Sequence, residues 1–178
     1  MLFRSQRSIG DAASAQAATL IAEESSRLYD AMHGIIPRLT PLVLDSLGLA
    51  EALAELADRT RSAHPGVNLD LKVELPDVEL APDASLALYR AAQEGITNAL
   101  RHGGARHLSL QVQAHPRQVA LSLQDDGCGF DPATPAPAGG AGHHGLRWLT
   151  ERVEGLGGTL VMAPARPRGV VMSVSVPR

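Results

Sequence analysis

The sequence is poor in cysteine and in aromatic residues. Cys128 is the single cysteine among 178 residues, so no internal disulfide bond can form, and we expect a reducing, cytoplasmic environment. Aromatic side chains make up 3% of the sequence, which leaves few platforms on which nucleic-acid bases could stack. The formal net charge of −3 also disfavours a nucleic-acid partner. We therefore expect a core of aliphatic residues and no DNA or RNA partner.

Long apolar runs are absent as well. The sequence contains no stretch of about 18 apolar residues that could span a bilayer, and no extended apolar segment follows residues 1–4 as in a secretory signal. With 44% hydrophobic and 20% charged residues, a chain of this length can bury one core and carry an appended helical element. We expect a soluble globular chain, although a full-length protein containing it could be attached to a membrane.

The segment that ends at His102 has two faces of different chemistry. Small and apolar residues form one stripe at 3.6 residues per turn, namely Leu88, Ala91, Ala92, Gly95, Ile96 and Ala99. The opposite face carries Arg90, Glu94, Asn98, Arg101 and His102. A carboxylate and a carboxamide one turn apart, with basic groups at both ends, suit a magnesium-bound polyphosphate. On this segment alone, an ordinary solvated helix face is the alternative.

A carboxylate and two glycines follow an alternating strand. A carboxylate only accepts hydrogen bonds, so Asp125 at the strand end can take the exocyclic amine of adenine, where guanine has a carbonyl. Gly127 and Gly129 carry no side chain, which lets the backbone approach a ring closely. We expect Cys128 to be a small filler, since no basic neighbour in the sequence would activate its thiol.

Residues 131–144 contain three prolines and three glycines without apolar periodicity. They predict a mobile loop, and its position between two candidate nucleotide segments favours a lid over a plain linker. Gly145 and Leu146 then open another helix, whose first N–H groups can hold phosphate. The adjacent His143 and His144 lack a third metal ligand at suitable spacing, so a polar loop is the better interpretation.

The order of the expected elements predicts a two-layer α+β sandwich. Strands are expected at residues 67–75, 108–112, 119–123, 159–163 and 169–176, with helices at 83–102 and from 145. Pro116 marks the turn of a hairpin that delivers Asp125 to a strand end. We assign residues 46–178 to this domain and residues 1–45 to a separate helical segment.

The N-terminal segment carries a heptad stripe. Apolar and small residues recur at alternating spacings of three and four, namely Ala18, Ile21, Ser25, Leu28, Met32, Ile35, Leu39 and Leu42. An isolated helix would leave this stripe in water, so we expect a homodimer through it, with packing onto its own domain as the alternative. The run Leu44-Asp45-Ser46-Leu47-Gly48-Leu49 follows, and it indicates a turn and a second helix that ends before Pro65.

These features together resemble the ATP-binding domain of sensor histidine kinases, in the wider family shared with gyrase, the Hsp90 chaperones and MutL. The helix around Asn98 resembles the asparagine box, and Asp125-x-Gly127-x-Gly129 resembles the first glycine box, in matching order and separation. The Leu44–Leu49 run resembles the junction of histidine kinases of the nitrate- and sugar-phosphate-response type. The resemblance covers roughly residues 11–178. It implies ATP and Mg²⁺ as cofactors, and transfer of the γ-phosphoryl group to a histidine and onward to the receiver domain of a response regulator.

The resemblance also implies roles for single residues. Asn98 would hold the magnesium ion, and Glu94 would orient or deprotonate a nucleophile near the γ-phosphate. Arg101 and His102 would offset phosphate charge. Gly142, Gly145 and Leu146 would form a second glycine box around the phosphates.

Two positions depart from the family pattern. The second glycine box places His143-His144 before Gly145, and Val170 follows Gly169 where a threonine is usual. Both changes affect the phosphate side, so we expect adenine recognition more firmly than catalysis. An anti-sigma-type serine kinase, or a degenerate ATP-binding dimerisation module without turnover, are the alternatives.

His33 does not match the phosphoaccepting histidine of this family. It is followed by Gly34 instead of an acidic residue, and the family's acceptor lies a whole helix further upstream of the Leu44–Leu49 run. We therefore expect the chain to bind ATP without phosphorylating itself on a histidine.

Overall fold

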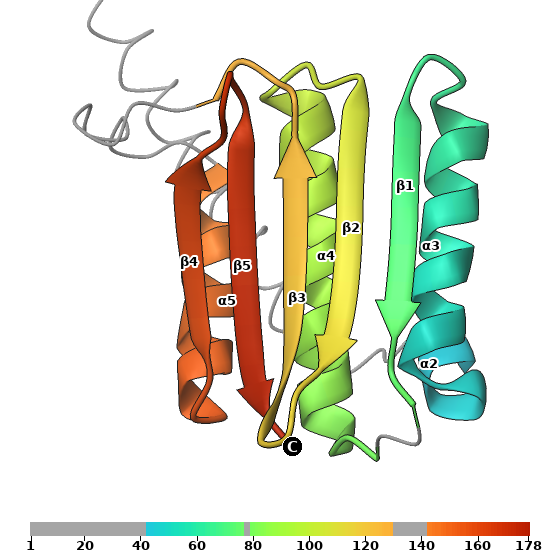
Figure 1. Ribbon diagram of the computed structural model, residues 1–178, viewed down its shortest axis with the longest axis vertical. Helices are drawn as coiled ribbons and strands as arrows, with labels where there is room; N and C mark the ends of the chain where they lie inside the picture. Colours follow the sequence, from blue (N-terminus) through green and yellow to red (C-terminus); the bar gives the residue numbers. More distant parts are fainter. Residues whose placement is uncertain (1–41, 77–78, 130–141) are drawn as a thin grey trace, which may run out of the picture. The chain divides into compact units, whose positions relative to one another are not determined.

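Five strands form one mixed sheet in the order β1-β2-β3-β5-β4 (Figure 1). The protein is described by a computed structural model that covers residues 42–76, 79–129 and 142–178. The strands are β1 (Asn68–Glu74), β2 (His107–Ala114), β3 (Gln118–Asp125), β4 (Thr159–Pro164) and β5 (Val170–Pro177). The helices are α2 (Leu42–Leu47), α3 (Leu49–Ala63), α4 (Pro82–Arg101) and α5 (Gly142–Gly155). The predicted α+β sandwich is therefore confirmed.

The sheet has one parallel pair, and its other neighbours are antiparallel. β1 pairs in parallel with β2, and α4 provides the crossover that such a pair requires. β2 and β3 form the predicted hairpin, in which Leu108 lies opposite Asp125. β5 pairs with β3 and β4. This register places the last residue of β3 beside the first residues of β2, at one end of the strands.

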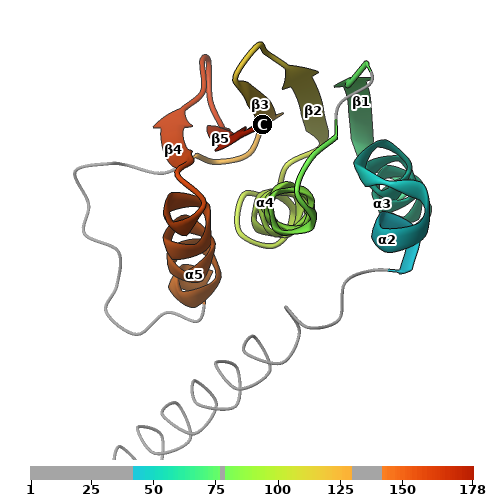
Figure 2. The same ribbon diagram turned by 90° about the horizontal axis from the view of Figure 1, so that it is seen from below.

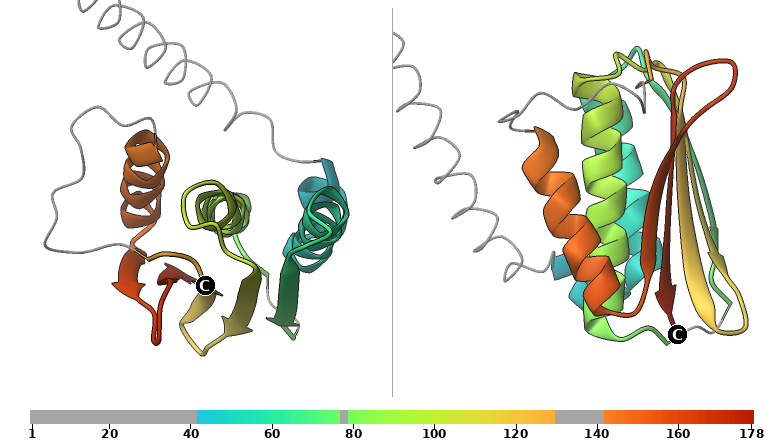
Figure 3. Two further views of the ribbon diagram at one scale, coloured as in Figure 1. Left: turned by 90° about the horizontal axis from the view of Figure 1, so that it is seen from above. Right: turned by 90° about the vertical axis from the view of Figure 1, so that its left-hand side faces the viewer.

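The helices α3, α4 and α5 cover one face of the sheet (Figures 2 and 3). All six residues of the predicted apolar stripe on α4 are buried. Gly95 lies where α4 approaches the sheet most closely, because a Cβ there would overlap Leu123 and lie 2.6 Å from the Met172 methyl carbon. The apolar stripe is thus buried against the sheet, as its periodicity predicts. The opposite face of α4 carries polar side chains.

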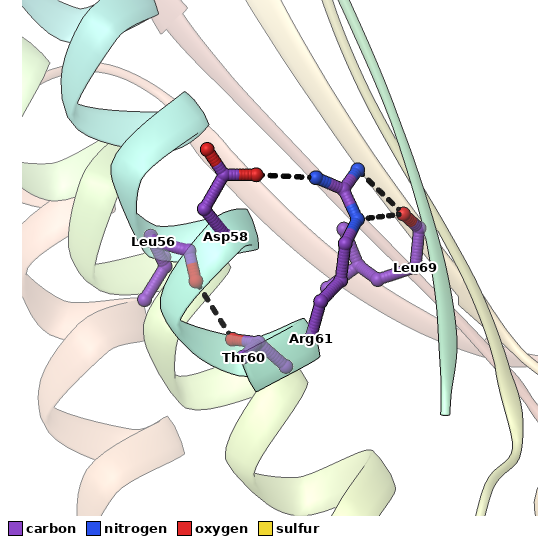
Figure 4. A network of polar contacts seen from close by, with 5 residues as sticks. All are labelled: Leu56, Asp58, Thr60, Arg61 and Leu69. Carbon is purple, nitrogen blue, oxygen red and sulfur yellow. Dashed lines mark hydrogen bonds and ion pairs between the residues drawn. The ribbon is translucent and has the colours of Figure 1, made fainter. Parts of the chain in front are cut away.

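The edge strand β1 is tied to α3 by one arginine (Figure 4). Arg61 donates from Nε and Nη2 to the Leu69 carbonyl oxygen at 3.0 and 2.7 Å, and from Nη1 to Asp58 at 2.7 Å. Thr60 donates its hydroxyl to the Leu56 carbonyl at 2.8 Å within the same helix. A polar network therefore holds this edge of the sheet against its covering helix.

Two expectations about helices need correction. The run after Leu42 is a six-residue helix, α2, with Gly48 alone as the break before α3. α5 begins at Gly142 instead of Gly145. The prolines of the preceding segment all lie before residue 138, so nothing in residues 142–144 interrupts backbone hydrogen bonding. The heptad stripe up to Leu39 and most of the expected lid fall outside the described residues.

No helix within the described ranges is long and apolar enough to cross a membrane.

Candidate functional site

Asp125 is a buried carboxylate at the end of β3. Asp125 is 7% exposed. Its Oδ1 accepts a hydrogen bond from the Gly127 N–H at 2.8 Å. Within the described part of the chain, Oδ2 accepts no hydrogen bond. Oδ2 is not among the buried side-chain atoms that lack a partner, so it reaches solvent and can accept a donor from a ligand. The geometry therefore fits a ligand that brings an N–H group to this oxygen.

The neighbouring Asp126 forms hydrogen bonds with the start of β2. Its Oδ1 accepts from the backbone N–H groups of Arg106 and His107 at 2.7 and 2.9 Å, and its Oδ2 lies 2.9 Å from His107 Nδ1. The hydrogen bonds from His107, backbone and side chain, and then from the Arg106 backbone hold the pKa of the Asp126 carboxyl well below its usual range. Asp126 is therefore ionised at neutral pH, and it anchors the segment that follows Asp125.

Three chain segments converge behind Asp125 at positions that exclude side chains. A Cβ at Gly127 would lie 2.7 Å from the Gly103 carbonyl oxygen, just past the end of α4. Gly169, in the turn before β5, has φ of 101°, and a Cβ there would overlap the Asp125 carbonyl. Gly129 has φ of 77°, and its Cβ would lie 3.1 Å from the Gly169 carbonyl oxygen. Only glycine satisfies both the close approach and the backbone conformation here.

Cys128 lies on the outside of this turn. Its N–H donates to the Gly103 carbonyl oxygen at 2.9 Å, which joins the turn to the end of α4. Its side chain is exposed. Its thiol lies 3.5 Å from the carbonyl oxygens of His102 and Gly129. The expected small filler is thus an exposed residue whose backbone makes the shorter contact with the end of α4.

The polar face of α4 brings three of the expected residues together. The Asn98 amide nitrogen donates to Glu94 Oε1 at 3.2 Å, and both side chains are half-buried. Gly145 of α5 faces the Glu94 carboxylate so closely that a Cβ at this position would overlap Oε1. The helix therefore presents a carboxylate and an amide oxygen beside the first turns of α5.

The other expected residues form no side-chain hydrogen bond with Glu94 or Asn98 among the described residues. Arg101 and His102 are exposed at the last turn of α4, where the His102 N–H donates to the Asn98 carbonyl oxygen at 2.9 Å. Leu146 is half-buried and packs against the hydrophobic core. Gly142 is the first residue of α5.

Two residues of the site were not among the predicted ones. Gly103 and Gly169 contribute the close contacts with Gly127 and Asp125. In the sequence, Gly103 only follows the expected helix 83–102, and Gly169 only precedes Val170 in a departure from the family pattern. Nothing in a one-dimensional pattern distinguishes a glycine that ends a helix from one that accommodates a distant segment.

Metal-binding side chains are scarce in this part of the molecule. Over the described ranges, no three His, Cys, Asp or Glu residues are grouped so that they could hold a metal ion. The amide donation to Glu94 leaves Asn98 Oδ1 free to face a cation, so a single protein oxygen is available beside Glu94. Such a sparse donor set fits Mg²⁺, which keeps water and phosphate oxygens as its main ligands.

Comparison with known families identifies the C-terminal half of the chain. Residues 83–178 match the family described as histidine kinase-, DNA gyrase B-, and HSP90-like ATPase. Three similar proteins are named as sensors or histidine-protein kinases. They are the signal transduction histidine-protein kinase/phosphatase UhpB of Salmonella typhimurium strain LT2 (32% identical over 92% of this chain), the signal transduction histidine-protein kinase/phosphatase DegS of Bacillus subtilis strain 168 (32% over 77%), and the nitrate/nitrite sensor protein NarQ of Escherichia coli strain K12 (30% over 90%).

The chain spans only about a third of these relatives, since the matches cover 31%, 36% and 28% of their lengths. Two solved structures share the fold. The histidine kinase domain of the blue-light activated kinase EL346 of Erythrobacter litoralis has a TM-score of 0.57 at 21% identity, over 72% of this chain and 64% of its own. The catalytic domain of histidine kinase ThkA has a TM-score of 0.52 at 16% identity, over 71% of this chain and 92% of its own.

Proposed function

Because the chain belongs to the family of histidine kinase-, DNA gyrase B-, and HSP90-like ATPases, we propose that it is the ATP-binding catalytic part of a two-component sensor histidine kinase. In this role it transfers the ATP γ-phosphoryl group to a histidine and onward to a response regulator. The similar proteins are named as histidine kinases or as a nitrate/nitrite sensor, so the alternative of an anti-sigma-type serine kinase is not favoured.

One observation supports this proposal above all others. Asp125 is buried beside glycines, and one of its carboxylate oxygens has no donor among the described residues. The exocyclic amine of adenine would supply that donor, whereas the carbonyl of guanine would face the carboxylate and be repelled. Gly127 and Gly129 let the turn after Asp125 pack against the backbone of Gly103 and Gly169, which would hold the carboxylate in place for the base.

The polar face of α4 would handle the phosphates. Asn98 would offer its amide oxygen to a magnesium ion, which offsets charge on the phosphate oxygens when bound. Glu94, fixed by the Asn98 amide at 3.2 Å, would orient the attacking group or take its proton. Gly142, Gly145 and Leu146 in the first turns of α5 would border the phosphates, and the exposed Arg101 and His102 would add positive charge.

Two partners complete the proposal. A response regulator receiver domain would accept the phosphoryl group, in line with the two-component role. The heptad stripe from Ala18 to Leu42 would form a homodimer, because its apolar side chains need a partner surface.

Calorimetric titration with ATP, ADP and GTP, with and without magnesium, tests the proposal. The parent should bind ATP and ADP and discriminate strongly against GTP. Asp125→Asn should weaken ATP and ADP alike, by about 100-fold, because it replaces a charge-assisted hydrogen bond in a buried site. Asp70→Asn, on an exposed residue of β1, should leave both affinities unchanged.

The magnesium assignment has its own readout. Asn98→Ala should weaken magnesium-dependent ATP binding more than magnesium-free ADP binding, because only the former uses the amide oxygen. Equal losses for both ligands would indicate that Asn98 has a structural role. If the parent binds no adenine nucleotide, or if Asp125→Asn binds ADP as tightly as the parent, the nucleotide assignment is wrong.

A further inference from the structure

The junction run Leu44–Leu49 is a motif that nucleotide binding does not explain. In the structure it borders a cavity of about 630 Å³ between α2, the start of α3, the segment after β1 and the start of α4. Five of the six residues in the run line this cavity. α2 and the start of α4, which border the cavity, lie at the opposite end of the sheet from the end of β3 (Figure 1), and the volume is in the range of sites that accept ligand groups. We call it the junction cavity.

The walls of the junction cavity combine apolar side chains with polar groups. Leu44 and Leu49 are each 6% exposed, and the half-buried Leu75 and Leu80 join them from the segment between β1 and α4. A group that enters the cavity therefore meets leucine side chains from three parts of the chain. The leucine side chains can cover an apolar group of a ligand, while the polar groups of the lining remain available for its charged or hydrogen-bonding parts.

The rim of the junction cavity is acidic. Asp45, Glu51 and Glu79 are exposed along it, and no Lys, Arg or His lines the cavity. Over the described ranges, none of these three carboxylates takes part in an ion pair. The chain thus leaves three carboxylates without an ion pair around a cavity partly lined by leucine, and a positively charged partner would gain on-rate and specificity there.

Leu47 adds an exposed apolar contact to this surface. It lines the cavity and is 63% exposed. Among the described residues, it is one of two large hydrophobic side chains with this degree of exposure, the other being Val161 at 57%. Leu44 and Leu49 of the same run are buried, whereas Leu47, at this exposure, contributes little to the core. An exposed leucine beside a cavity that other leucines line is typical of a contact surface.

We propose that the junction cavity is a docking site for a basic amphipathic segment of a partner protein. An apolar side chain of the segment would enter the leucine-lined hollow and cover Leu47, while its Lys or Arg side chains would face Asp45, Glu51 and Glu79. A second copy that docked through the same surface would bring two acidic rims together, and this like-charge contact disfavours self-association here. The proposal is independent of nucleotide binding at Asp125.

Fluorescence anisotropy with the full 178-residue chain tests the proposal. The probe is a labelled 15-residue peptide of leucine and lysine, with the leucines on one helical face. A peptide with lysine replaced by glutamate and a scrambled leucine–lysine peptide serve as controls. The parent should bind the first peptide, and should bind both controls at least about tenfold more weakly, because rim charge and an apolar face are both required.

Matched variants locate the site. The triple variant Asp45→Asn, Glu51→Gln, Glu79→Gln should weaken peptide binding by about tenfold or more, since it removes the charges that face the peptide. The triple variant Asp70→Asn, Glu151→Gln, Glu154→Gln removes the same net charge from exposed positions elsewhere and should leave binding within about twofold. Leu47→Ser should weaken binding without unfolding the chain, because Leu47 is already exposed.

Three results would overturn the proposal. The first is that the parent does not bind the leucine–lysine peptide. The second is an equal loss of binding in the two triple variants, which would indicate attraction by net charge alone. The third is a dimer, detected by light scattering, that Leu47→Ser dissociates, which would make a second copy the occupant.

Discussion

The segments around the two ends of α4 differ in whether their polar groups have hydrogen-bond or ion-pair partners within the protein. At the carboxyl end, the backbone of Gly103 and the side chain of Asp126 hold the Asp125–Gly129 turn by hydrogen bonds of 2.7–2.9 Å. At the amino end, the carboxylates of the junction cavity have no ion pairs within the described ranges, and the space between them is lined by leucine. The turn at the carboxyl end is held by its own hydrogen bonds, whereas at the amino end Asp83 pairs with Arg152 and the three carboxylates around the junction cavity have no ion pair within the described ranges.

This difference indicates two kinds of recognition. A site that must read a small planar group needs its acceptor held in place before binding, because ordering it afterwards would weaken the affinity. A surface that meets a flexible segment can leave its charges solvated until the partner arrives. We therefore expect substitutions at the carboxyl end to change stability and nucleotide affinity together, and substitutions around the junction cavity to leave nucleotide affinity unchanged.

The largest effect is expected for Gly169→Val. The side chain would overlap the Asp125 carbonyl, and valine disfavours the φ of 101° at this position. Unfolding in urea should show a loss of about 3–5 kcal/mol. Gly155→Ala, where a Cβ meets no atom within 4 Å, is the control and should leave stability equal or higher. A loss below about 1 kcal/mol for Gly169→Val would show that the three segments are not closely packed.

Asp126→Ala should cost about 2–3 kcal/mol, because it removes charge-assisted hydrogen bonds to Arg106 and His107. The substitution should also weaken ADP binding, since the hydrogen bonds of Asp126 position the turn that follows Asp125. The pKa of Asp126 is lowered in the folded state, so its contribution is complete above the ordinary aspartate pKa of about 4 and declines as the pH falls below it.

Urea unfolding of the parent and Asp126→Ala between pH 3 and pH 7 measures this contribution. The difference in stability should be constant from about pH 5 to pH 7 and shrink toward pH 3. Glu154→Ala, at an exposed position of α5, should show no such pH-dependent difference. A difference between parent and Asp126→Ala that grows on acidification would contradict the assigned role.

Gly48→Ala should cost about 1–2 kcal/mol at the amino end. Gly48 has φ of 91° and ψ of −179°, a conformation that residues with a Cβ rarely adopt. The nearest atom to an added Cβ is Glu51 Oε2 at 3.9 Å, so backbone strain is the only cost. Calorimetric ADP affinity should stay within about twofold of the parent. A large loss of nucleotide affinity would show that the two ends of α4 are coupled.

Leu47→Ser should have the smallest effect, within about 0.5 kcal/mol on stability, because the leucine is already 63% exposed. Leu49→Ser, at a buried neighbour in the same run, should instead cost about 2 kcal/mol or more. Thermal or urea unfolding of both variants makes the comparison. Equal losses for the two would mean that Leu47 is part of the core, and would remove the main reason to regard it as a contact residue.

Local periodicity accounts for much of the fold. The apolar stripe of α4 from Leu88 to Ala99, the hairpin around Pro116 and the strand ending at Asp125 all follow from spacing, because side chains repeat every 3.6 residues in a helix and every two in a strand. The same spacing placed Glu94 and Asn98 on one face, and the structure joins them by a hydrogen bond. The predicted start of α5, Gly145, lies three residues after the observed start, Gly142. A glycine can lie within a helix as well as at its start, so its position does not fix where the helix begins.

Contacts between distant segments could not be obtained in this way. Gly169 lies against Asp125, Gly145 against Glu94, and Gly103 against Gly127, and each pair is separated by many residues. The junction cavity also arises where α2, α3 and the segment before α4 meet. A sequence pattern reports which face a residue occupies within its own element. The register of the strands and the packing of helices on the sheet decide which residues of different elements meet, because these depend on the shape of the whole core.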